Sequence, residues 1–148
     1  MAILVRPASA ADAGRLAKFD CFSGDRIAEI IEKRMIVAEV DGTVAGYIAW
    51  QARGLAGADY VNRLVTDPPF RQRGVANRLV EQLPFYLQGR VFISAGEHNE
   101  GASRLLARTG WIKAGSIRGM RPDDERELFF FKDLVAPGRS ENDTGSHG

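Results

Sequence analysis

Cysteine is nearly absent from this chain, which has one, Cys21, among its 148 residues. A lone thiol cannot form an internal disulfide bond, and no cluster of Cys and His residues marks a structural metal site. Cys21 lies between Asp20 and Phe22, where a neighbouring carboxylate disfavours the reactive thiolate. We therefore expect a small, semi-buried residue at this position and no metal ion.

Long apolar runs are missing too, because none approaches the roughly twenty residues that a helix needs to cross a bilayer. The opening segment Met1–Pro7 is short and lacks the basic front end of a signal peptide, so we expect a cytoplasmic protein with no membrane partner. The formal net charge is only +1, whereas domains dedicated to nucleic acids usually carry a marked basic excess. No nucleic-acid partner is therefore expected.

What remains is the composition of an ordinary soluble protein, with 45% hydrophobic and 26% charged residues. A chain of 148 residues has room for one domain, which buries about two thirds of the surface that the unfolded chain exposes. We place this domain at residues 1–135. Residues 136–148 contain almost no apolar side chain, which predicts a disordered tail.

Hydrophobic periodicity predicts alternating strands and helices. Strands are expected at residues 3–6, 35–40, 43–51, 60–66, 91–95, 111–117 and 128–134, and helices at residues 9–19, after Ser23, at 73–83 and at 99–108. The Asp41–Gly42 pair predicts a hairpin with a type I′ turn. The order of the elements predicts an α/β sandwich in which helices flank a mixed β-sheet.

Three of these elements carry a more detailed expectation. Ile27, Ile30 and Ile31 are expected on one buried face of the second helix. The strand at 91–95 is nearly all apolar, which predicts burial of both of its faces. In the strand at 60–66 the apolar residues do not keep one parity, which indicates a β-bulge.

The segment Leu64–Ala76 joins a strand, a proline-stiffened turn and an Arg-x-x-Gly-x-Ala loop that runs straight into a helix. The first N–H groups of a helix have no intrahelical partner, and the aligned peptide dipoles add about half a positive charge, so a phosphate fits there. Gly74 lets the backbone approach a ligand. Positive charge surrounds the site at Arg71, Arg73 and Arg78. No Walker lysine follows, which excludes a nucleotide P-loop.

Three segments in this order resemble the GNAT (Gcn5-related N-acetyltransferase) superfamily, and the resemblance covers about residues 3–134. The loop Arg71–Ala76, together with the preceding Leu64–Pro68, resembles the family's acetyl-CoA pyrophosphate loop. Asn99–Trp111 is similar to the family's Asn-x-x-Ala-x-x-Leu-Tyr-x-x-x-Gly-Phe stretch. The opening Val5–Ala8, followed by an Ala-Asp helix, is similar to the family's first segment. The order and spacing of the segments make a chance match unlikely.

The resemblance implies an N-acetyltransferase that uses acetyl-CoA as co-substrate and acts on a primary amine of a small molecule or peptide. Backbone N–H groups at the loop would hold the CoA pyrophosphate, and the strand before it would pair with the pantetheine arm like an added strand. The amide of Leu64 would also stabilise the thioester oxygen as it becomes an oxyanion, and Asn99 would hydrogen-bond the arm. The implied cofactor residues are Leu64, Val65, Thr66, Arg71, Gln72, Arg73, Gly74, Val75, Ala76, Asn77 and Asn99.

The chain departs from the family pattern where many members have a tyrosine that protonates the leaving CoA thiolate. This position is Leu106, and leucine has no proton to give. The proton must then come from water, from the hydroxyl of Ser103 or Thr109, or from the substrate, unless the thiolate leaves unprotonated. Turnover is expected to be slower as a result.

The amine must also lose a proton before it can attack. Tyr60 stands where some family members have a glutamate base, but a phenol is a poor base at neutral pH. Glu97 follows the buried strand and ranks first as a base acting through a water, the alternative being a solvated loop carboxylate. His98 is expected to be an exposed loop residue.

In this family the acceptor usually lies between the first helices and the last hairpin, which correspond here to Phe22–Arg34 and Arg118–Glu127. The second segment holds an acidic cluster that either attracts a cationic amine or is a solvated loop, and its members are Asp123, Asp124, Glu125 and Glu127. Two other functions stay open: a regulatory module that binds acyl-CoA with little or no transfer, and an interaction domain whose loop binds only phosphate or nothing. A homodimer is one expected assembly, because small α/β acetyltransferases are often dimers.

Overall fold

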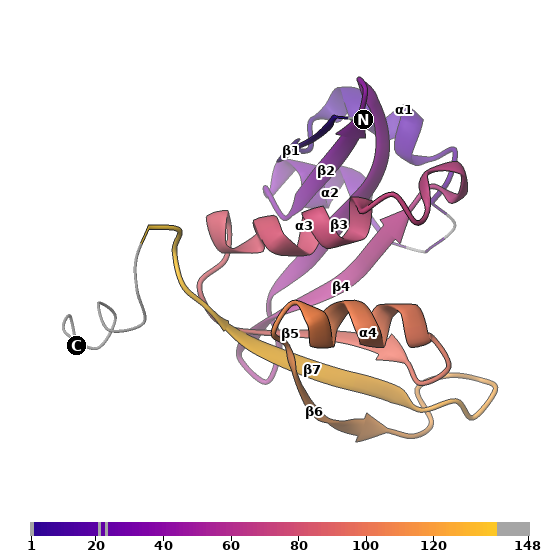
Figure 1. Cartoon of the computed structure of the whole chain (residues 1–148), viewed down its shortest axis with the longest axis vertical. Coiled ribbons are helices and arrows are strands. Elements are labelled where there is room, and N and C mark those ends of the chain that lie inside the picture. The colour runs from indigo at the N-terminus through magenta and orange to yellow at the C-terminus, as the bar shows by residue number, and fades with distance from the viewer. Residues whose placement is uncertain (1, 21, 23, 139–148) are drawn as a thin grey trace. The chain divides into compact units, whose positions relative to one another are not determined.

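A computed structural model describes residues 2–20, 22 and 24–138 of the chain (Figure 1). The described residues form two compact units. The first unit contains the described residues up to Ala52 and the segment Val61–Gln82. The second unit contains Arg53–Tyr60 and the described residues from Leu83 onwards. The expectation for Cys21 and most of the predicted tail lie outside the described residues, and the domain limits of 1–135 and 136–148 stay a prediction.

Four strands contribute to the first unit, although residues 53–60, at the end of the third strand and the start of the fourth, belong to the second unit. The strands are β1 at Ile3–Pro7, β2 at Met35–Val40, β3 at Thr43–Leu55 and β4 at Ala58–Thr66, in the order β1-β2-β3-β4. Both β1 with β2 and β2 with β3 pair antiparallel. Asp41 and Gly42 have φ angles of 48° and 87°, which confirms the type I′ turn because that turn needs positive φ at both central residues.

The register between β2 and β3 contains an irregularity. Ala38 pairs with Gly46 while the next residue, Glu39, pairs with Val44, so Ala45 is an extra residue on β3. The backbone N–H of Asp67, just after β4, donates to the carbonyl oxygen of Ala45 at 2.8 Å. This bulge therefore anchors the chain at the start of the predicted loop, whereas the bulge expected in β4 stays a prediction.

The first helical segment is shorter than the sequence predicts. It consists of the 3-10 turn η1 at Ala10–Asp12 and α1 at Ala13–Leu16, rather than a helix that continues to Phe19. The backbone N–H groups of Lys18 and Phe19 donate three residues back, at 3.2 Å each, so the chain tightens into a turn. The helix ends because these tighter bonds replace the regular pattern.

The second helix, α2 at Arg26–Ile31, has a different buried face from the predicted one. Ile30 is 8% exposed, but Ile27 and Ile31 are 47% and 71% exposed. Glu29 faces inwards instead, with 5% exposure, because its carboxylate is paired with the guanidinium of Arg63. An isoleucine stripe predicts the packing of a six-residue helix poorly, since a single buried ion pair sets its rotation.

Helices cover both faces of the strands in the first unit. On one face the core consists of Leu16, Ile30, Met35, Val37, Val44, Tyr47, Ala49 and Val65, which come from α1, α2 and the strands. The other face carries α3 at Val75–Gln82, which contacts β1 and β2. A Cβ built on Gly46 would lie 2.9 Å from the side chain of Val75, so glycine is what lets α3 sit this close to β3.

The second unit contains the remaining elements. They are the 3-10 turn η3 at Leu83–Phe85, β5 at Gly89–Gly96, α4 at Glu100–Arg108, β6 at Ile112–Ile117 and β7 at Glu127–Leu134. The strand order is β5-β7-β6, and both pairings are antiparallel. Gly110, with φ of 90°, follows the end of α4 as the sequence predicts.

Two strands of the second unit are more exposed than expected. In β5 the odd-numbered residues from Val91 to Ala95 are buried while Phe92 and Ser94 are half-buried, so the prediction of two covered faces is wrong. All six residues of β6 are exposed, because this strand lies at the edge of the sheet. Phe92 and Ser94 therefore lie on a side of β5 that no apolar core fully covers.

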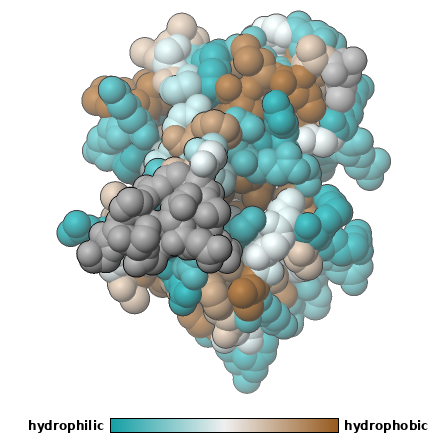
Figure 2. Space-filling model, turned by 60° about the vertical axis from the view of Figure 1, so that its left-hand side comes forward, coloured by the Kyte–Doolittle hydropathy of each residue, from teal (hydrophilic) through white to brown (hydrophobic). Residues whose placement is uncertain are grey.

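The surface mixes polar and apolar side chains. Figure 2 shows brown apolar patches separated by teal polar residues on one face of the molecule. Among the residues that the structure describes, no helix is long and apolar enough to cross a membrane, and no group of three or more His, Cys, Asp or Glu side chains is arranged to hold a metal ion.

A partly buried ion pair in the first unit depends on an ionised carboxylate. Asp12 accepts hydrogen bonds from Arg6 at 2.8 and 2.9 Å and from the backbone N–H of Ser9 at 2.8 Å. The bonds from Arg6, helped by Ser9, hold the pKa of the Asp12 carboxyl below its usual value although burial opposes them.

Because the folded-state pKa of Asp12 is lowered, its stabilising effect is present above the unfolded value of about 3.9 and is lost as the pH falls through the folded value. We expect the free energy of unfolding, measured by urea titration, to drop from pH 5 downwards, and the drop to be smaller in Asp12→Asn. An identical pH dependence in the two proteins would contradict this assignment.

Candidate functional site

The loop between β4 and α3 is fixed at its first turn. After Asp67, the 3-10 turn η2 at Pro68–Phe70 is closed by bonds from Phe70 N–H to Asp67 O at 2.8 Å and from Arg71 N–H to Pro68 O at 3.2 Å. The side chain of Asp67, itself buried, forms an ion pair with Arg15 of α1. The loop therefore leaves β4 from a rigid position.

The backbone beyond this turn exposes a series of donors. Gln72 has φ of 62° and Gly74 has φ of 85°, so two left-handed residues turn the chain into α3. The first bond of the helix runs from Arg78 N–H to Gly74 O at 3.0 Å. The N–H groups of Gly74–Asn77 form no hydrogen bond with any described residue. Four consecutive donors at a positive helix end are thus available to an anion.

The side chains around these donors are mostly cationic. Arg71, Arg73 and Arg78 are exposed and form no ion pair within the described part of the chain. The guanidinium of Arg73 lies 5.5 Å from the centre of the Phe70 ring, a cation–π contact that orients it. Asn77 donates from its side chain to Glu81 at 2.7 Å, while its backbone N–H is one of the four donors.

The predicted strand residues lie just before this loop. Val65 is 9% exposed and belongs to the core, whereas Leu64 and Thr66 are half-buried. The structure thus brings the predicted residues 64–66 and 71–77 together in one continuous segment of the first unit. Three other predicted site residues, Tyr60, Glu97 and Asn99, belong to the second unit.

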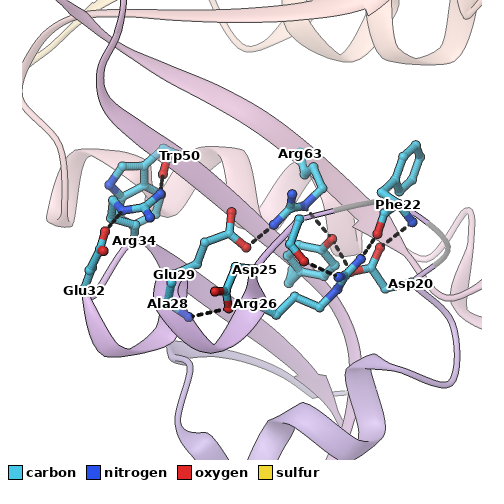
Figure 3. Close-up of polar contacts among 12 residues, drawn as sticks. Asp20, Phe22, Asp25, Arg26, Ala28, Glu29, Glu32, Arg34, Trp50 and Arg63 are labelled. Carbon is cyan, nitrogen blue, oxygen red and sulfur yellow. Dashed lines mark hydrogen bonds and ion pairs between the residues drawn. The ribbon is translucent and has the colours of Figure 1, made fainter.

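A buried polar network, not predicted from the sequence, connects Asp20 and α2 with the strands (Figure 3). The Tyr47 hydroxyl donates to Asp20 Oδ2 at 2.7 Å and accepts from Arg63 Nε at 3.0 Å. Arg26 also pairs with Asp20, and Arg63 pairs with Glu29. Burial and the bond to Asp20 raise the pKa of Tyr47 well above its usual range. Hydrogen bonds from Arg26 and Tyr47 outweigh burial and lower the pKa of Asp20.

The network connects elements of the first unit that are distant in sequence. Arg63 points from β4 towards Glu29 on α2, as the labelled side chains in Figure 3 show. The side chains of Asp20 and Arg63 are 0% and 8% exposed, so neither charge has much access to water. The ion pair between Glu29 and Arg63 therefore holds α2 against β4, and Asp20 is held by Arg26 and Tyr47.

Asn99 caps α4 in the second unit. Its Oδ1 accepts the backbone N–H of Ala102 at 3.1 Å, which leaves the side-chain NH2 group as the donor available to a ligand. Glu97 is held by the neighbouring loop: its Oε1 accepts the N–H of Arg126 at 3.0 Å and lies 3.9 Å from Nε2 of His98. The predicted role of Glu97 as a base stays a prediction, while His98 is exposed as expected.

A hydrogen-bonded series that the sequence did not reveal crosses three strands of the second unit. The Tyr60 hydroxyl lies 2.6 Å from Ser94 Oγ, and Ser94 Oγ donates to Glu127 Oε2 at 2.8 Å. The other oxygen of Glu127 accepts from Arg121 Nε at 2.8 Å. The Tyr60 ring is stacked on Phe129 with centres 6.3 Å apart. These contacts connect a half-buried phenol to a carboxylate whose side chain is 13% exposed.

The position of the missing family tyrosine is part of the core. Leu106 is 1% exposed and packs in the interior. Thr109 Oγ1 donates to the carbonyl oxygen of Leu105 at 2.8 Å, so this hydroxyl is already engaged. Ser103 Oγ is buried and has no hydrogen-bond partner among the described residues. Of the two hydroxyls predicted to replace the tyrosine, Ser103 is the one that remains available.

The acidic cluster before β7 is balanced by arginines. Asp124 forms a two-bond ion pair with Arg118 at 3.0 and 3.1 Å, and Glu127 pairs with Arg121. Glu125 Oε1 accepts a backbone N–H from the loop after β5 at 2.8 Å. The cluster therefore offers less free negative charge to a cationic amine than its composition indicates.

Residues 11–111 of the chain match the family described as the acetyltransferase (GNAT) family. An acetyltransferase of the GNAT family from Bacillus cereus is similar in structure, with 19% identity, a TM-score of 0.81, and coverage of 91% of this chain and 99% of that one. No curated protein matches in sequence.

Two further solved structures are similar at 14% identity. The ribosomal-protein-S18-alanine N-acetyltransferase of Escherichia coli covers 94% of this chain and 98% of its own, with a TM-score of 0.74. The protein yncA of Salmonella typhimurium, solved with its cofactor acetyl-CoA, covers 95% and 99%, with a TM-score of 0.75. The predicted fold class, a mixed β-sheet flanked by helices, is confirmed.

Proposed function

Because the chain belongs to the acetyltransferase (GNAT) family, we propose that it transfers the acetyl group of acetyl-CoA to a primary amine of a small molecule or peptide by direct attack. The observation that carries this proposal is the group of N–H donors at Gly74–Asn77 that have no partner among the described residues. Arginines that form no ion pair in that part of the chain surround them. Their arrangement suits a pyrophosphate. The acetyl-CoA found in the structure of yncA supports the same co-substrate.

The cofactor residues divide by the part of acetyl-CoA that each would meet. The loop donors and Arg71 would bind the pyrophosphate, and Gly74 would let it approach the backbone. The backbone of residues 64–66 would pair with the pantetheine arm, and the Asn99 side-chain NH2 would donate to it. Acetyl-CoA supplies an activated acyl group when bound.

The chemical step needs a donor for the developing oxyanion and an acceptor for the proton of the amine. The Leu64 backbone N–H would donate to the thioester oxygen, a contribution of roughly 3 kcal/mol when the donor is preorganised. Tyr60 or Glu97 would accept the proton, directly or through a water. The leaving thiolate would take its proton from water, from the substrate or from Ser103, whose Oγ is buried and has no partner in the described structure.

The acceptor is proposed to contact the α1–α2 segment and the segment before β7. Phe22, Ile27 and Ile31 are 54%, 47% and 71% exposed, so the first segment offers apolar contacts as well as charge. A cytoplasmic location and a homodimer stay predictions.

A second function rests on Leu106. Because a buried leucine replaces the usual proton donor, the chain would then bind acyl-CoA as a regulatory module with little or no transfer. Binding would be intact in this case and amine-dependent turnover absent.

Two measurements on the full chain separate these functions. We expect acetyl-CoA at about 100 times its Kd to stabilise the protein by roughly 2.7 kcal/mol in thermal unfolding, with inorganic pyrophosphate stabilising it less. We then expect thiol release from acetyl-CoA when spermidine, amino acids or peptides with a free N-terminus are added. Stabilisation without thiol release would support the regulatory module, and no stabilisation by any CoA compound would rule out both functions.

A further inference from the structure

The series Tyr60, Ser94 and Glu127 has a definite hydrogen-bond direction. Glu127 Oε1 is occupied by Arg121, and Oε2 accepts the hydroxyl proton of Ser94 at 2.8 Å. Since Ser94 has one hydroxyl proton, the 2.6 Å contact must place the proton of Tyr60 on the side of Ser94. The remaining lone pair of the Tyr60 oxygen is then an acceptor, although a phenol by itself is a poor base.

We propose that Tyr60, Ser94 and Glu127 form a proton relay that deprotonates the acceptor amine, with Tyr60 touching the amine and Glu127 receiving the proton. This inference rests on the proposed function and replaces Glu97 by Tyr60 as the group that meets the amine. Tyr60 lies on β4, the strand that also holds Leu64, whose amide is proposed to meet the thioester.

The relay conserves protons and charge. The ammonium gives one proton to the Tyr60 oxygen, the Tyr60 hydroxyl proton moves to Ser94 Oγ, and the Ser94 hydroxyl proton moves to Glu127 Oε2. The products are a neutral amine with a lone pair and a neutral carboxyl group, while both hydroxyls are restored. No step requires an additional reactant.

The surroundings of the relay suit this transfer. Stacking on Phe129 fixes the Tyr60 ring. Ser94, which is opposite Phe129 in the β5–β7 register, reaches Glu127 two positions along β7. Arg121 stays on Oε1 and leaves Oε2 to the relay. With its side chain 13% exposed, Glu127 is partly shielded from water, whereas the half-buried Tyr60 can still meet a substrate. Ser94 and Glu127 act through Tyr60 and are positioning residues.

The test compares pH–rate profiles of the full chain with whichever amine of the panel (spermidine, alanine or the peptide Ala-Ala-Ala) gives the fastest thiol release. In Glu127→Gln the new amide NH2 donates to Ser94, which reverses the series and blocks the Tyr60 oxygen. We expect kcat at pH 7 to fall at least roughly tenfold, with the KM for acetyl-CoA unchanged. The deficit should shrink as the pH rises, because more of the amine arrives already deprotonated.

Matched variants distinguish the relay from a structural role. Ser94→Ala should reproduce the loss and Ser94→Thr should restore most of the rate, because threonine keeps the hydroxyl. Asp133 lies on β7, as Glu127 does, and its carboxylate pairs with Arg90 of β5. Asp133→Asn removes this carboxylate and should leave the pH–rate profile unchanged.

The outcomes separate the two proposals. Wild-type rates in Glu127→Gln and Ser94→Ala at every pH would overturn the relay and leave the proposed transferase activity standing. The relay would also be overturned if Glu97→Gln, rather than these variants, lost the pH-dependent step. If the wild-type chain releases no thiol with any amine of the panel, the proposed transferase activity fails and the relay fails with it.

Discussion

Replacing Gly74 by alanine is expected to remove most of the stabilisation that acetyl-CoA gives to the full chain. Gly74 has φ of 85°, and a Cβ built there meets no protein atom within 4 Å, so the methyl group would stand in the space that the pyrophosphate is proposed to enter. In thermal unfolding, saturating acetyl-CoA should raise the Tm of the wild-type protein by roughly 5–10 °C and that of Gly74→Ala by a small fraction of this.

Gly57, in the turn between β3 and β4, provides the matched control. It also has φ of 85° and also has no atom within 4 Å of a built Cβ, so alanine causes the same backbone strain there. Each variant without ligand should lose about 1 kcal/mol of stability. Gly57→Ala should keep the full response to acetyl-CoA, and an equal response in the two variants would show that the ligand does not approach Gly74.

Replacing Arg63 by methionine is expected to cost about 3–5 kcal/mol of the free energy of unfolding. Arg63 pairs with Glu29, whose side chain is 6% exposed, and it also donates to the Tyr47 hydroxyl. Without the guanidinium, the buried carboxylate has lost its charged partner, and a carboxylate far from water is costly. Urea unfolding at pH 7 measures the change.

Two further variants test the cause of that loss. The double variant Arg63→Met with Glu29→Met should recover most of the stability, because no unpaired charge then remains buried: Asp20 keeps its ion pair with Arg26. Arg104→Met removes an exposed arginine, 71% accessible and 3.6 Å from Glu100, and should change stability by less than about 0.5 kcal/mol. If Arg63→Met behaved like Arg104→Met, the pair with Glu29 would not be buried in solution.

The parts of the fold that depend on neighbouring residues could be predicted from the sequence. The Asp41–Gly42 turn, the glycine after α4 and the loop Arg71–Ala76 are each determined by backbone preferences within a few residues. The proposed cofactor loop belongs to this class, because its donors come from one continuous stretch of chain.

The networks that depend on distant residues could not be predicted. Tyr60 and Ser94 are 34 positions apart, as are Glu29 and Arg63, and nothing in the spacing of these residues indicates a contact. The rotation of α2 was predicted wrongly for the same reason, since Glu29 is turned inwards by its distant partner. Candidate bases read from the sequence were therefore limited to residues beside recognisable motifs.

The most direct test of acetyl transfer is its stoichiometry. The full chain is incubated with acetyl-CoA and a primary amine that promotes thiol release, and the free thiol and the N-acetylated amine are quantified together, the latter by mass spectrometry. Direct attack predicts one acetylated amine for each CoA released, with no release when the amine is omitted. Thiol release without acetylated product, or release that does not depend on any amine, would contradict the proposed function.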